Sequence, residues 1–311
     1  MNSKPVGHRD LPASSVSGGD GRLAGIAPEV LIVAGSLSVQ CGGGLATVLV
    51  RDYGPLPAVA MRIVFGAVLL AAIRPPRVRG ASREAIAWCV ALGIVLAAMN
   101  TLFFVSLSKI PIGVAVTIEF WGPLAVGVLG SRRAFDLVWV GLAAAGIYVL
   151  AGGRLVADDA VGVVAAAASG LCWAIYIGVA ARVGRHWPDG RGLTLAMLVA
   201  SALIIPVTLA LSSPAPLLAA PAALAGGVVI GLFNSAIPYT MEIAALRRMK
   251  ASTFGVLMSL EPAIAAVVGF VMLGQILGTS ELAAIAVVAV ASAGASWTAR
   301  RTIAIGELET P

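Results

Sequence analysis

Charged residues are scarce in this chain, and their scarcity excludes an ordinary soluble domain. Only 12% of the 311 residues are Asp, Glu, Lys or Arg, whereas 59% are hydrophobic. A soluble domain carries about 25% charged residues, because it has to cover a surface that faces water. The mean hydropathy of +0.98 instead indicates a chain that folds in lipid.

Histidine and cysteine are also rare. The chain has two histidines, His8 and His186, and its three cysteines, Cys41, Cys89 and Cys172, fall inside apolar runs without paired spacing. The sequence therefore predicts no metal site, no cofactor and no disulfide framework. It also lacks the Asp-rich, His-rich or Ser/His sets that membrane-embedded enzymes use, so we expect no enzymatic activity.

Long apolar runs fill most of the chain. Each has about the length that a helix needs to cross ~30 Å of hydrocarbon. Ten such runs cover residues 30–50, 56–73, 85–107, 111–131, 136–152, 160–182, 193–211, 222–245, 251–274 and 281–299. They are too long and too continuously apolar for barrel strands. We therefore predict an all-α polytopic membrane protein with ten transmembrane helices.

The basic residues gather in every second gap between these runs. Seventeen of the 21 are Lys4, Arg9, Arg22, Arg74, Arg77, Arg79, Arg83, Arg132, Arg133, Arg182, Arg185, Arg191, Arg247, Arg248, Lys250, Arg300 and Arg301. Cytoplasmic loops carry an excess of Lys and Arg, so this bias predicts that both termini face the cytoplasm. Because the basic residues are spread over six segments without interleaved aromatics, we expect no nucleic-acid partner.

An internal repeat is visible at a shift of 139 residues. Under this shift Pro123 meets Pro262, and Lys109 meets Arg248. Five spans separate the two copies, so they insert with opposite topology, as in many secondary transporters. We predict a five-helix repeat over 29–155 and a second over 156–301, with a flexible cytoplasmic tail at 1–28 and a short tail at 302–311.

Four ionisable side chains lie within predicted spans: Arg62, Glu119, Glu242 and Glu261. A charge near the bilayer centre costs at least ~2.5–3.5 kcal/mol, so each should face a cavity or a partner. Two structural alternatives stay open: Arg62 and Glu119 form a buried pair that fixes packing, or Glu242 reaches the basic loop that follows it. Glu261 has no basic partner at its depth and suits a group that binds and releases a proton.

Prolines interrupt two of the spans. Pro123 cannot donate to the carbonyl of Glu119, and Pro262 cannot donate to that of Met258. We name Pro123 and Pro262 as candidate hinges, although kinks without a ligand role are also common in membranes. We also expect Gly42–Gly44 to interrupt the first helix.

Polar and aromatic side chains recur at helical spacing and predict faces that point inward. These are Ser36 with Gln40, Asn100 with Phe104, Trp173 with Tyr176, and Ser235 with Tyr239 and Glu242. Each residue taken alone is explained by an ordinary helix–helix hydrogen bond. Together they predict a polar cavity with both charge signs, which suits a zwitterion such as an amino acid. The GxxxG pair Gly227 and Gly231 predicts close helix packing.

Several blocks resemble the threonine/homoserine exporter family, within the EamA group of the drug/metabolite transporter superfamily. They are Ser38–Gln40, Met61-Arg62, Asn100–Leu107, Thr117–Val126 continuing to Arg133, Cys172–Ile177, Pro238-Tyr239 with Glu242, and Thr253–Pro262. The resemblance covers about residues 29–300. Gly42–Gly44 and Trp121 depart from the pattern and put the shape of the cavity in doubt.

The resemblance implies a multi-pass carrier of the bacterial inner membrane that exports small amino acids by proton antiport. The lipid bilayer, protons and a small-molecule substrate are its expected partners, and the oligomeric state stays open. The candidate substrate-binding residues are Gln40, Arg62, Asn100, Glu119, Trp173, Tyr176, Tyr239 and Glu242, with Glu119 and Glu261 as proton-coupling residues. The alternatives are an exporter of another metabolite or drug, a non-transporting sensor or channel, and a membrane-embedded enzyme.

Overall fold

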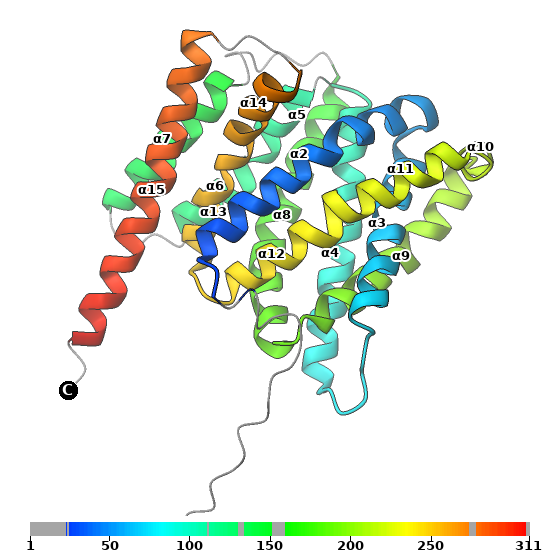
Figure 1. Cartoon of the computed structure of the whole chain (residues 1–311), viewed down its shortest axis with the longest axis horizontal. Coiled ribbons are helices and arrows are strands. Elements are labelled where there is room, and N and C mark those ends of the chain that lie inside the picture. The colour runs from blue at the N-terminus through cyan, green and yellow to red at the C-terminus, as the bar shows by residue number, and fades with distance from the viewer. Residues whose placement is uncertain are drawn as a thin grey trace, which may run out of the picture.

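The computed structural model describes Leu23 and residues 25–110, 112–129, 134–150, 159–273 and 278–308. Within these residues every regular element is a helix, and no strand occurs (Figure 1). The predicted all-helical class is therefore confirmed. Most of the predicted N-terminal tail, together with residues 151–158 and 309–311, lies outside the described part of the chain.

Among the described residues, six helical segments are long and apolar enough to cross a membrane. Each coincides with one of the predicted apolar runs. They are α2 (Pro28–Tyr53), α3 (Pro55–Ile73), α4 (Arg83–Leu107), α8 (Ala160–His186), α9 (Arg191–Leu211) and the continuous stack of α11 (Pro221–Gly231), η1 (Leu232–Ala236) and α12 (Ile237–Leu246). The η1 segment is one π-helical stretch inside that stack.

The other four runs also form helices. Two of them are split: α5 (Ile112–Glu119) is followed by α6 (Trp121–Leu129), and α13 (Ala251–Met258) by α14 (Leu260–Leu273). The remaining two are α7 (Ala134–Leu150) and α15 (Thr279–Leu308), and a single turn, α10 (Ala215–Leu218), precedes α11. Helix α15 continues past the predicted end at 299.

Helix starts follow the chemistry of their first residues. Pro28 and Pro55 occupy the first turns of α2 and α3, where a missing N–H costs nothing. The Ser82 hydroxyl accepts a hydrogen bond from the amide of Ala85 at 3.1 Å. Asp159 caps α8 by accepting from two backbone amides. These caps fix the residue at which each helix begins and thereby set the depth in the bundle of the residues that follow.

The predicted interruption of the first helix at Gly42–Gly44 is wrong, because α2 is continuous through the three glycines. No water is available in lipid to replace a broken backbone hydrogen bond, so the helix persists despite the low helix propensity of glycine. The predicted GxxxG contact is confirmed. A Cβ on Gly231 would lie 2.7 Å from Phe65 of α3, so α11 and α3 approach closely here.

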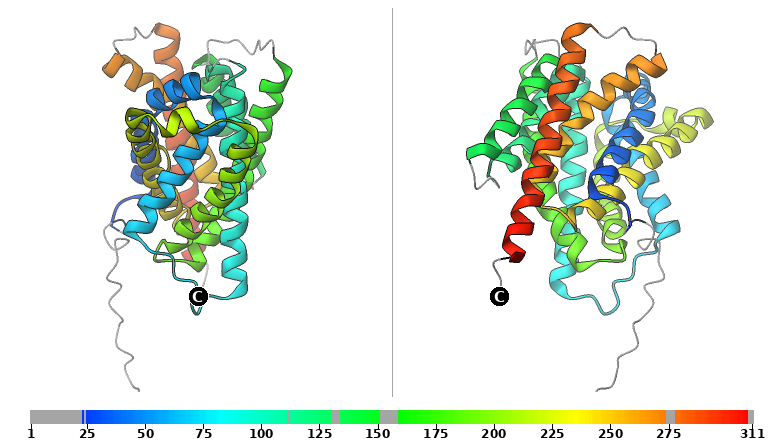
Figure 2. Two further views of the ribbon diagram at one scale, coloured as in Figure 1. Left: turned by 90° about the vertical axis from the view of Figure 1, so that its right-hand side faces the viewer. Right: turned by 60° about the vertical axis from the view of Figure 1, so that its left-hand side comes forward.

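Helices from the first half of the chain pack against helices from the second half. Helix α3 packs against α9, α6 against α13, and α7 against α15, while α4 lies along α8 and α2 along α12 (Figures 1 and 2). A buried cluster of aromatic and aliphatic side chains runs through the middle, with Tyr176, Phe104 and Phe120 among its largest members. This core surrounds the polar residues of the candidate site.

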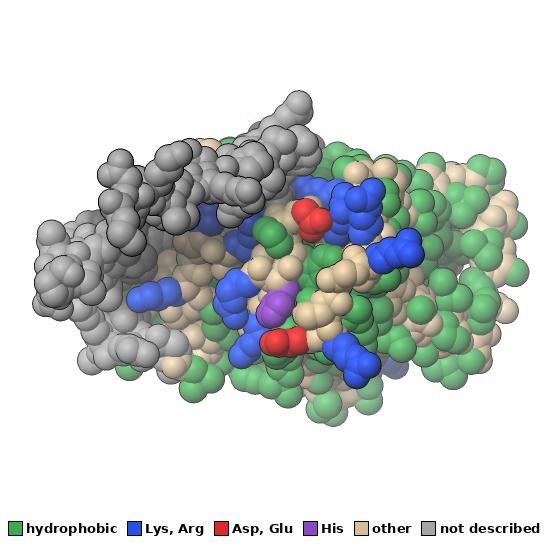
Figure 3. All heavy atoms as spheres, turned by 90° about the horizontal axis from the view of Figure 1, so that it is seen from below, with side chains coloured by type: hydrophobic (Ala, Val, Ile, Leu, Met, Phe, Trp, Pro, Cys, Tyr) green, Lys and Arg blue, Asp and Glu red, His purple; other side chains and the backbone are tan. Residues whose placement is uncertain are grey.

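One end of the bundle is basic. Helix α2 begins and α15 ends at the lower side of Figure 1, where the α3–α4, α8–α9 and α12–α13 connections also lie. Figure 3 shows Lys and Arg side chains gathered on that face. By contrast, large apolar side chains such as Leu129 and Val271 are exposed along the helices. The apolar helices indicate a multi-pass membrane protein.

Candidate functional site

A cavity with charged, polar and apolar side chains in its wall lies among the helices. It has a volume of about 110 Å³ and is lined by residues of α2, α3, α4, α5, α8, η1, α12 and α14. Seven predicted site residues line it: Arg62, Asn100, Glu119, Trp173, Tyr239, Glu242 and Glu261. The structure thus brings together the four ionisable side chains that sequence analysis placed within the spans. The cavity is large enough for several water molecules or one small solute.

Arg62 on α3 reaches across to the stack of η1 and α12. Its Nε donates to the Ser235 hydroxyl at 3.1 Å, and its Nη2 donates to the Asn234 carbonyl at 2.5 Å and to the Tyr239 hydroxyl at 3.2 Å. The guanidinium also lies 5.9 Å from the ring centroids of Phe104 and Tyr239. These contacts hold a cation at the cavity wall. Arg62 makes no ion pair with Glu119, so the predicted alternative of a direct pair is wrong.

The π-helical stretch η1 explains why Arg62 finds backbone acceptors there. A π-helical turn breaks the regular i to i−4 pattern and redirects carbonyl groups. The Ser38 hydroxyl of α2 donates to the Phe233 carbonyl at 2.7 Å, and Arg62 donates to that of Asn234. Side chains of α2 and α3 therefore donate hydrogen bonds to two carbonyl groups of η1. In lipid no water is available to bind such carbonyl groups.

Two of the three carboxyl groups are held by hydroxyl groups. Glu119 of α5 accepts a hydrogen bond from Ser169 of α8 at 2.5 Å. Glu242 of α12 accepts one from Tyr176 of α8 at 2.8 Å. Each glutamate is only 7% exposed. Glu242 is thus directed into the bundle and lines the cavity, in contrast to the predicted alternative in which it reaches the following loop.

Glu261 differs from the other two carboxyl groups. It lies in the first turn of α14, is half-buried and lines the cavity. Within the described part of the chain it makes no hydrogen bond or ion pair. Its carboxyl group is therefore the one that faces the cavity without a fixed protein donor.

Not every predicted site residue reaches the cavity. Gln40 does not line it; its neighbour Val39 does. Tyr176 lies behind the wall, where it positions Glu242. Trp121, which we expected to reshape the cavity, is 41% exposed and donates to the Ala167 carbonyl instead. The aromatic wall is formed by Phe120 and Trp173, whose ring centroids are 4.9 Å apart.

The helix interruptions fall where the prolines predicted them. The first break is at Phe120, directly after Glu119 and three residues before Pro123. The second is at Ser259, directly after Met258 and three residues before Pro262. The first break places Phe120 and Glu119 at the cavity wall. The side chain of Pro262 lies outside the described residues.

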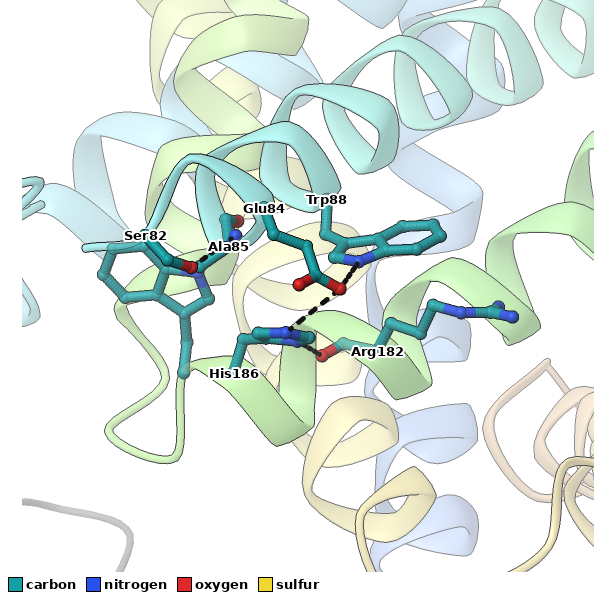
Figure 4. Close-up of polar contacts among 7 residues, drawn as sticks. Ser82, Glu84, Ala85, Trp88, Arg182 and His186 are labelled. Atoms are coloured by element: carbon teal, nitrogen blue, oxygen red, sulfur yellow. Dashed lines mark hydrogen bonds and ion pairs between the residues drawn. The ribbon is translucent and has the colours of Figure 1, made fainter.

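The basic ends of α4 and α8 are joined by side chains (Figure 4). Glu84 accepts a hydrogen bond from Trp88 at 3.4 Å and lies 3.7 Å from His186 of α8. Trp187 donates to the carbonyl of Ala85 at 3.2 Å in a buried contact. The two helices are therefore held together at the basic face, and the cavity lies farther along both of them.

Sequence reasoning missed seven residues of the wall. Six of them are apolar, so nothing in the sequence distinguishes them from other apolar residues of the spans: Val39, Met99, Phe103, Val116, Phe120 and Pro238. The seventh is Asn234, a polar residue in an apolar run. Its type was a signal, but regular helical spacing placed its neighbour Ser235 on the inward face.

Comparisons with known proteins show the family of the chain. Residues 160–297 match the model of the EamA-like transporter family. The chain is 35% identical over 293 residues to the threonine/homoserine exporter RhtA of Escherichia coli (strain K12), covering 91% of this chain and 95% of that protein. It is also 35% identical over 284 residues to the protein of the same name from Salmonella typhimurium (strain SL1344), covering 90% and 94%.

A solved structure described only as "crystal structure of protein" has the same fold. Its TM-score is 0.71 at 20% identity, and the match covers 88% of this chain and 98% of that one. At this identity the likeness concerns the fold alone. The identity to the two exporters extends over nearly the whole length of both partners. The chain therefore belongs to the threonine/homoserine exporter family of EamA-like transporters.

Proposed function

We propose that this protein exports small amino acids such as threonine or homoserine across the bacterial inner membrane in exchange for protons. The single observation that carries the proposal is the cavity whose wall combines Arg62 with three carboxyl groups. Its relatives are named threonine/homoserine exporters, which supports the same substrate class.

The chemistry of the cavity suits a small zwitterion. The Arg62 guanidinium carries a positive charge at the cavity wall, and its Nη1 is left to bind a carboxylate because Nε and Nη2 already donate to protein groups. Glu119, Glu242 and Glu261 offer acceptors to an ammonium group. Drug-sized ligands occupy pockets of about 300–1,000 Å³, so a volume of about 110 Å³ favours a small amino acid over a larger drug.

We assign proton coupling to Glu261, with Glu119 as the second candidate. Glu261 faces the cavity without a fixed donor, so protonation changes its interaction with the ligand directly. A ligand or proton shifts a two-state equilibrium only through its different affinity for the two states. We propose that protonated Glu261 favours the state that has released the amino acid.

We propose that ten transmembrane helices form two inverted five-helix repeats. Three features support this arrangement. The breaks at Phe120 and Ser259 are related by the 139-residue shift seen in the sequence. Asn100 donates to the Tyr239 hydroxyl at 3.0 Å, and these two residues are 139 apart, as expected where a pseudo-two-fold axis passes. The reciprocal packing of the helices follows the same symmetry.

Alternating access follows from this architecture. The substrate site lies at the seam between the repeats, where Arg62 contacts the late stack and Glu119 contacts α8. Rocking of the two repeats about this seam exposes the cavity to either side in turn. Pro123 and Pro262 then serve as hinges, because each leaves a carbonyl without its helical donor.

The proposal is tested by efflux of labelled threonine from proteoliposomes that contain the purified protein. We expect an external pH below the internal pH to accelerate efflux. Glu261→Gln should retain threonine exchange and lose the acceleration by the gradient. Glu84→Gln is the matched control, because Glu84 is an exposed glutamate at the basic face. Absence of any amino-acid flux from folded protein contradicts the function, whereas gradient-driven flux in Glu261→Gln contradicts only the assignment of Glu261.

A further inference from the structure

Ser169 of α8 lies where three helices meet. Its side chain is fully buried. Its hydroxyl oxygen lies 2.5 Å from Oε1 of Glu119 on α5 and 3.0 Å from the backbone carbonyl oxygen of Met99 on α4. Glu119 and Met99 both line the cavity, so this hydroxyl connects two parts of the cavity wall.

Close backbone packing places Ser169 beside Glu119. A Cβ on the neighbouring Gly170 would lie 2.6 Å from the backbone carbonyl oxygen of Glu119, and one on Gly122 would overlap the carbonyl of Gly170. Small residues allow helices in lipid to approach each other this closely. Helix α8 is therefore packed directly against the break between α5 and α6.

The Ser169 hydroxyl has one hydrogen atom and two acceptors within hydrogen-bond distance. A serine hydroxyl rotates, donates once and also accepts, whereas an ionised carboxylate only accepts and a protonated carboxyl group also donates. With Glu119 ionised, the hydroxyl donates to Glu119 and has no hydrogen left for Met99. With Glu119 protonated at Oε1, Glu119 donates to the hydroxyl, and the hydroxyl donates to the Met99 carbonyl. Protonation thus adds a hydrogen bond between α8 and α4.

We propose that Ser169 is a positioning residue that transmits the protonation of Glu119 to α4. The proposal rests on the proposed function, because it names the group that responds when Glu119, the second candidate for proton coupling, binds a proton. The proton comes from water in the cavity and returns to it, and Ser169 keeps its own hydrogen atom in both states. In the proposed arrangement α4 and α5 belong to the first repeat and α8 to the second. The added bond to Met99 therefore joins the two repeats.

Other ionisable groups surround Glu119 and have to be separated from it. They are Arg62 of α3, Cys172 of α8, Tyr239 and Glu242 of α12, and Glu261 of α14. Among the described residues, only Glu119 and Met99 form hydrogen bonds with the Ser169 side chain. A pH effect that originates at one of the other groups persists when Glu119 is replaced by glutamine, so this substitution separates the sources.

The test follows the Met99 carbonyl by infrared spectroscopy of the purified protein, with ¹³C in the carbonyl groups of its eight methionines. Met99→Leu identifies the Met99 band by its loss. A carbonyl that accepts an additional hydrogen bond absorbs at a lower wavenumber, so the wild-type band should shift downward as the pH falls. Ser169→Ala should keep the high-pH position at every pH. Glu119→Gln should keep the low-pH position, because its amide donates to Ser169 as a protonated carboxyl group does.

The matched control is Ser201→Ala. Ser201 is a buried serine whose hydroxyl donates to the Met197 carbonyl of its own helix, α9. This variant removes the same atom from a neighbouring helix without touching Glu119, and the Met99 band should shift with pH as in the wild-type protein.

Transport in proteoliposomes gives a second readout. Ser169→Ala should lower the acceleration of threonine efflux by a pH gradient by about twofold to tenfold, which is the effect of one hydrogen bond. Threonine exchange at equal pH on both sides should be retained. A merely structural serine would lower exchange and acceleration together.

Four outcomes overturn the proposal: a wild-type Met99 band that does not move with pH, a shift that persists in Ser169→Ala, a pH-dependent shift that persists in Glu119→Gln, or an equal loss of exchange and acceleration in folded Ser169→Ala. The expected band shifts without any amino-acid flux contradict the proposed function and support the role of Ser169. Gradient-driven flux without the band shift contradicts only the role of Ser169.

Discussion

At the scale of a single residue, Arg62 is the position that we expect to be most sensitive to substitution. It joins α3 to the stack of η1 and α12 at the cavity. Its fork of donors reaches a hydroxyl and a carbonyl in neighbouring residues and a second hydroxyl one turn later. A lysine ammonium is a point charge on a flexible stem and cannot reproduce this planar arrangement. The side chain thus fixes the geometry of the cavity as well as its charge.

We therefore expect Arg62→Lys to lower threonine efflux from proteoliposomes by about tenfold or more, because each hydrogen bond to a charged group contributes about 1.5–3 kcal/mol. Arg191→Lys provides the control, since Arg191 forms a surface ion pair with Asp189 and such pairs contribute little. Efflux is normalised to folded protein measured by gel filtration. Wild-type rates in Arg62→Lys exclude a geometric role for the guanidinium.

The charged residues of the site were predictable because a charge inside an apolar run has few permitted positions. Arg62, Glu119, Glu242 and Glu261 all line the cavity as a result. Helical spacing did not predict Asn234. Inward-facing residues were counted with the period of a regular α-helix, and the π-helical stretch changes that period locally. A π-helical stretch leaves no clear mark in the sequence.

At the scale of a single helix, the main features are the places where the helix is interrupted. At Phe120 the chain leaves α5 and enters α6, and Pro123 has no N–H to offer the carbonyl of Glu119. Proline made this break predictable, whereas the glycine-based interruption of α2 was wrong. Proline removes a donor and adds a clash, whereas glycine only lowers helix propensity. Proline alone does not end a helix, because α9 continues through Pro206.

Pro123→Ala restores the missing donor and should favour a continuous helix through Phe120. One regained backbone hydrogen bond contributes about 0.5–1.5 kcal/mol, so we expect the melting temperature to rise and threonine efflux to slow by about twofold to tenfold. Pro206→Ala is the matched control, because Pro206 lies inside the uninterrupted helix α9. Equal effects of the two substitutions on efflux contradict a specific hinge at Pro123.

At the scale of the whole molecule, the helix boundaries were far easier to predict than the packing. Apolar length marks a helix in lipid, but helices that are apolar all round do not reveal which neighbour each face meets. The contacts between α3 and α9 and between α7 and α15 come only from the structure. Small residues such as Gly231 gave the one packing contact that the sequence predicted.

The basic face predicts the orientation of the whole bundle, because positively charged loops stay in the cytoplasm. In a variant whose three cysteines are replaced, a cysteine at Arg79 should lie inside and one at Ser213 outside, since both positions are exposed and lie in connections at opposite ends of helices. A membrane-impermeant maleimide applied to intact cells should label Ser213→Cys and leave Arg79→Cys unlabelled until the membrane is permeabilised. Labelling of Arg79→Cys in intact cells reverses the orientation, and the proposed direction of export reverses with it.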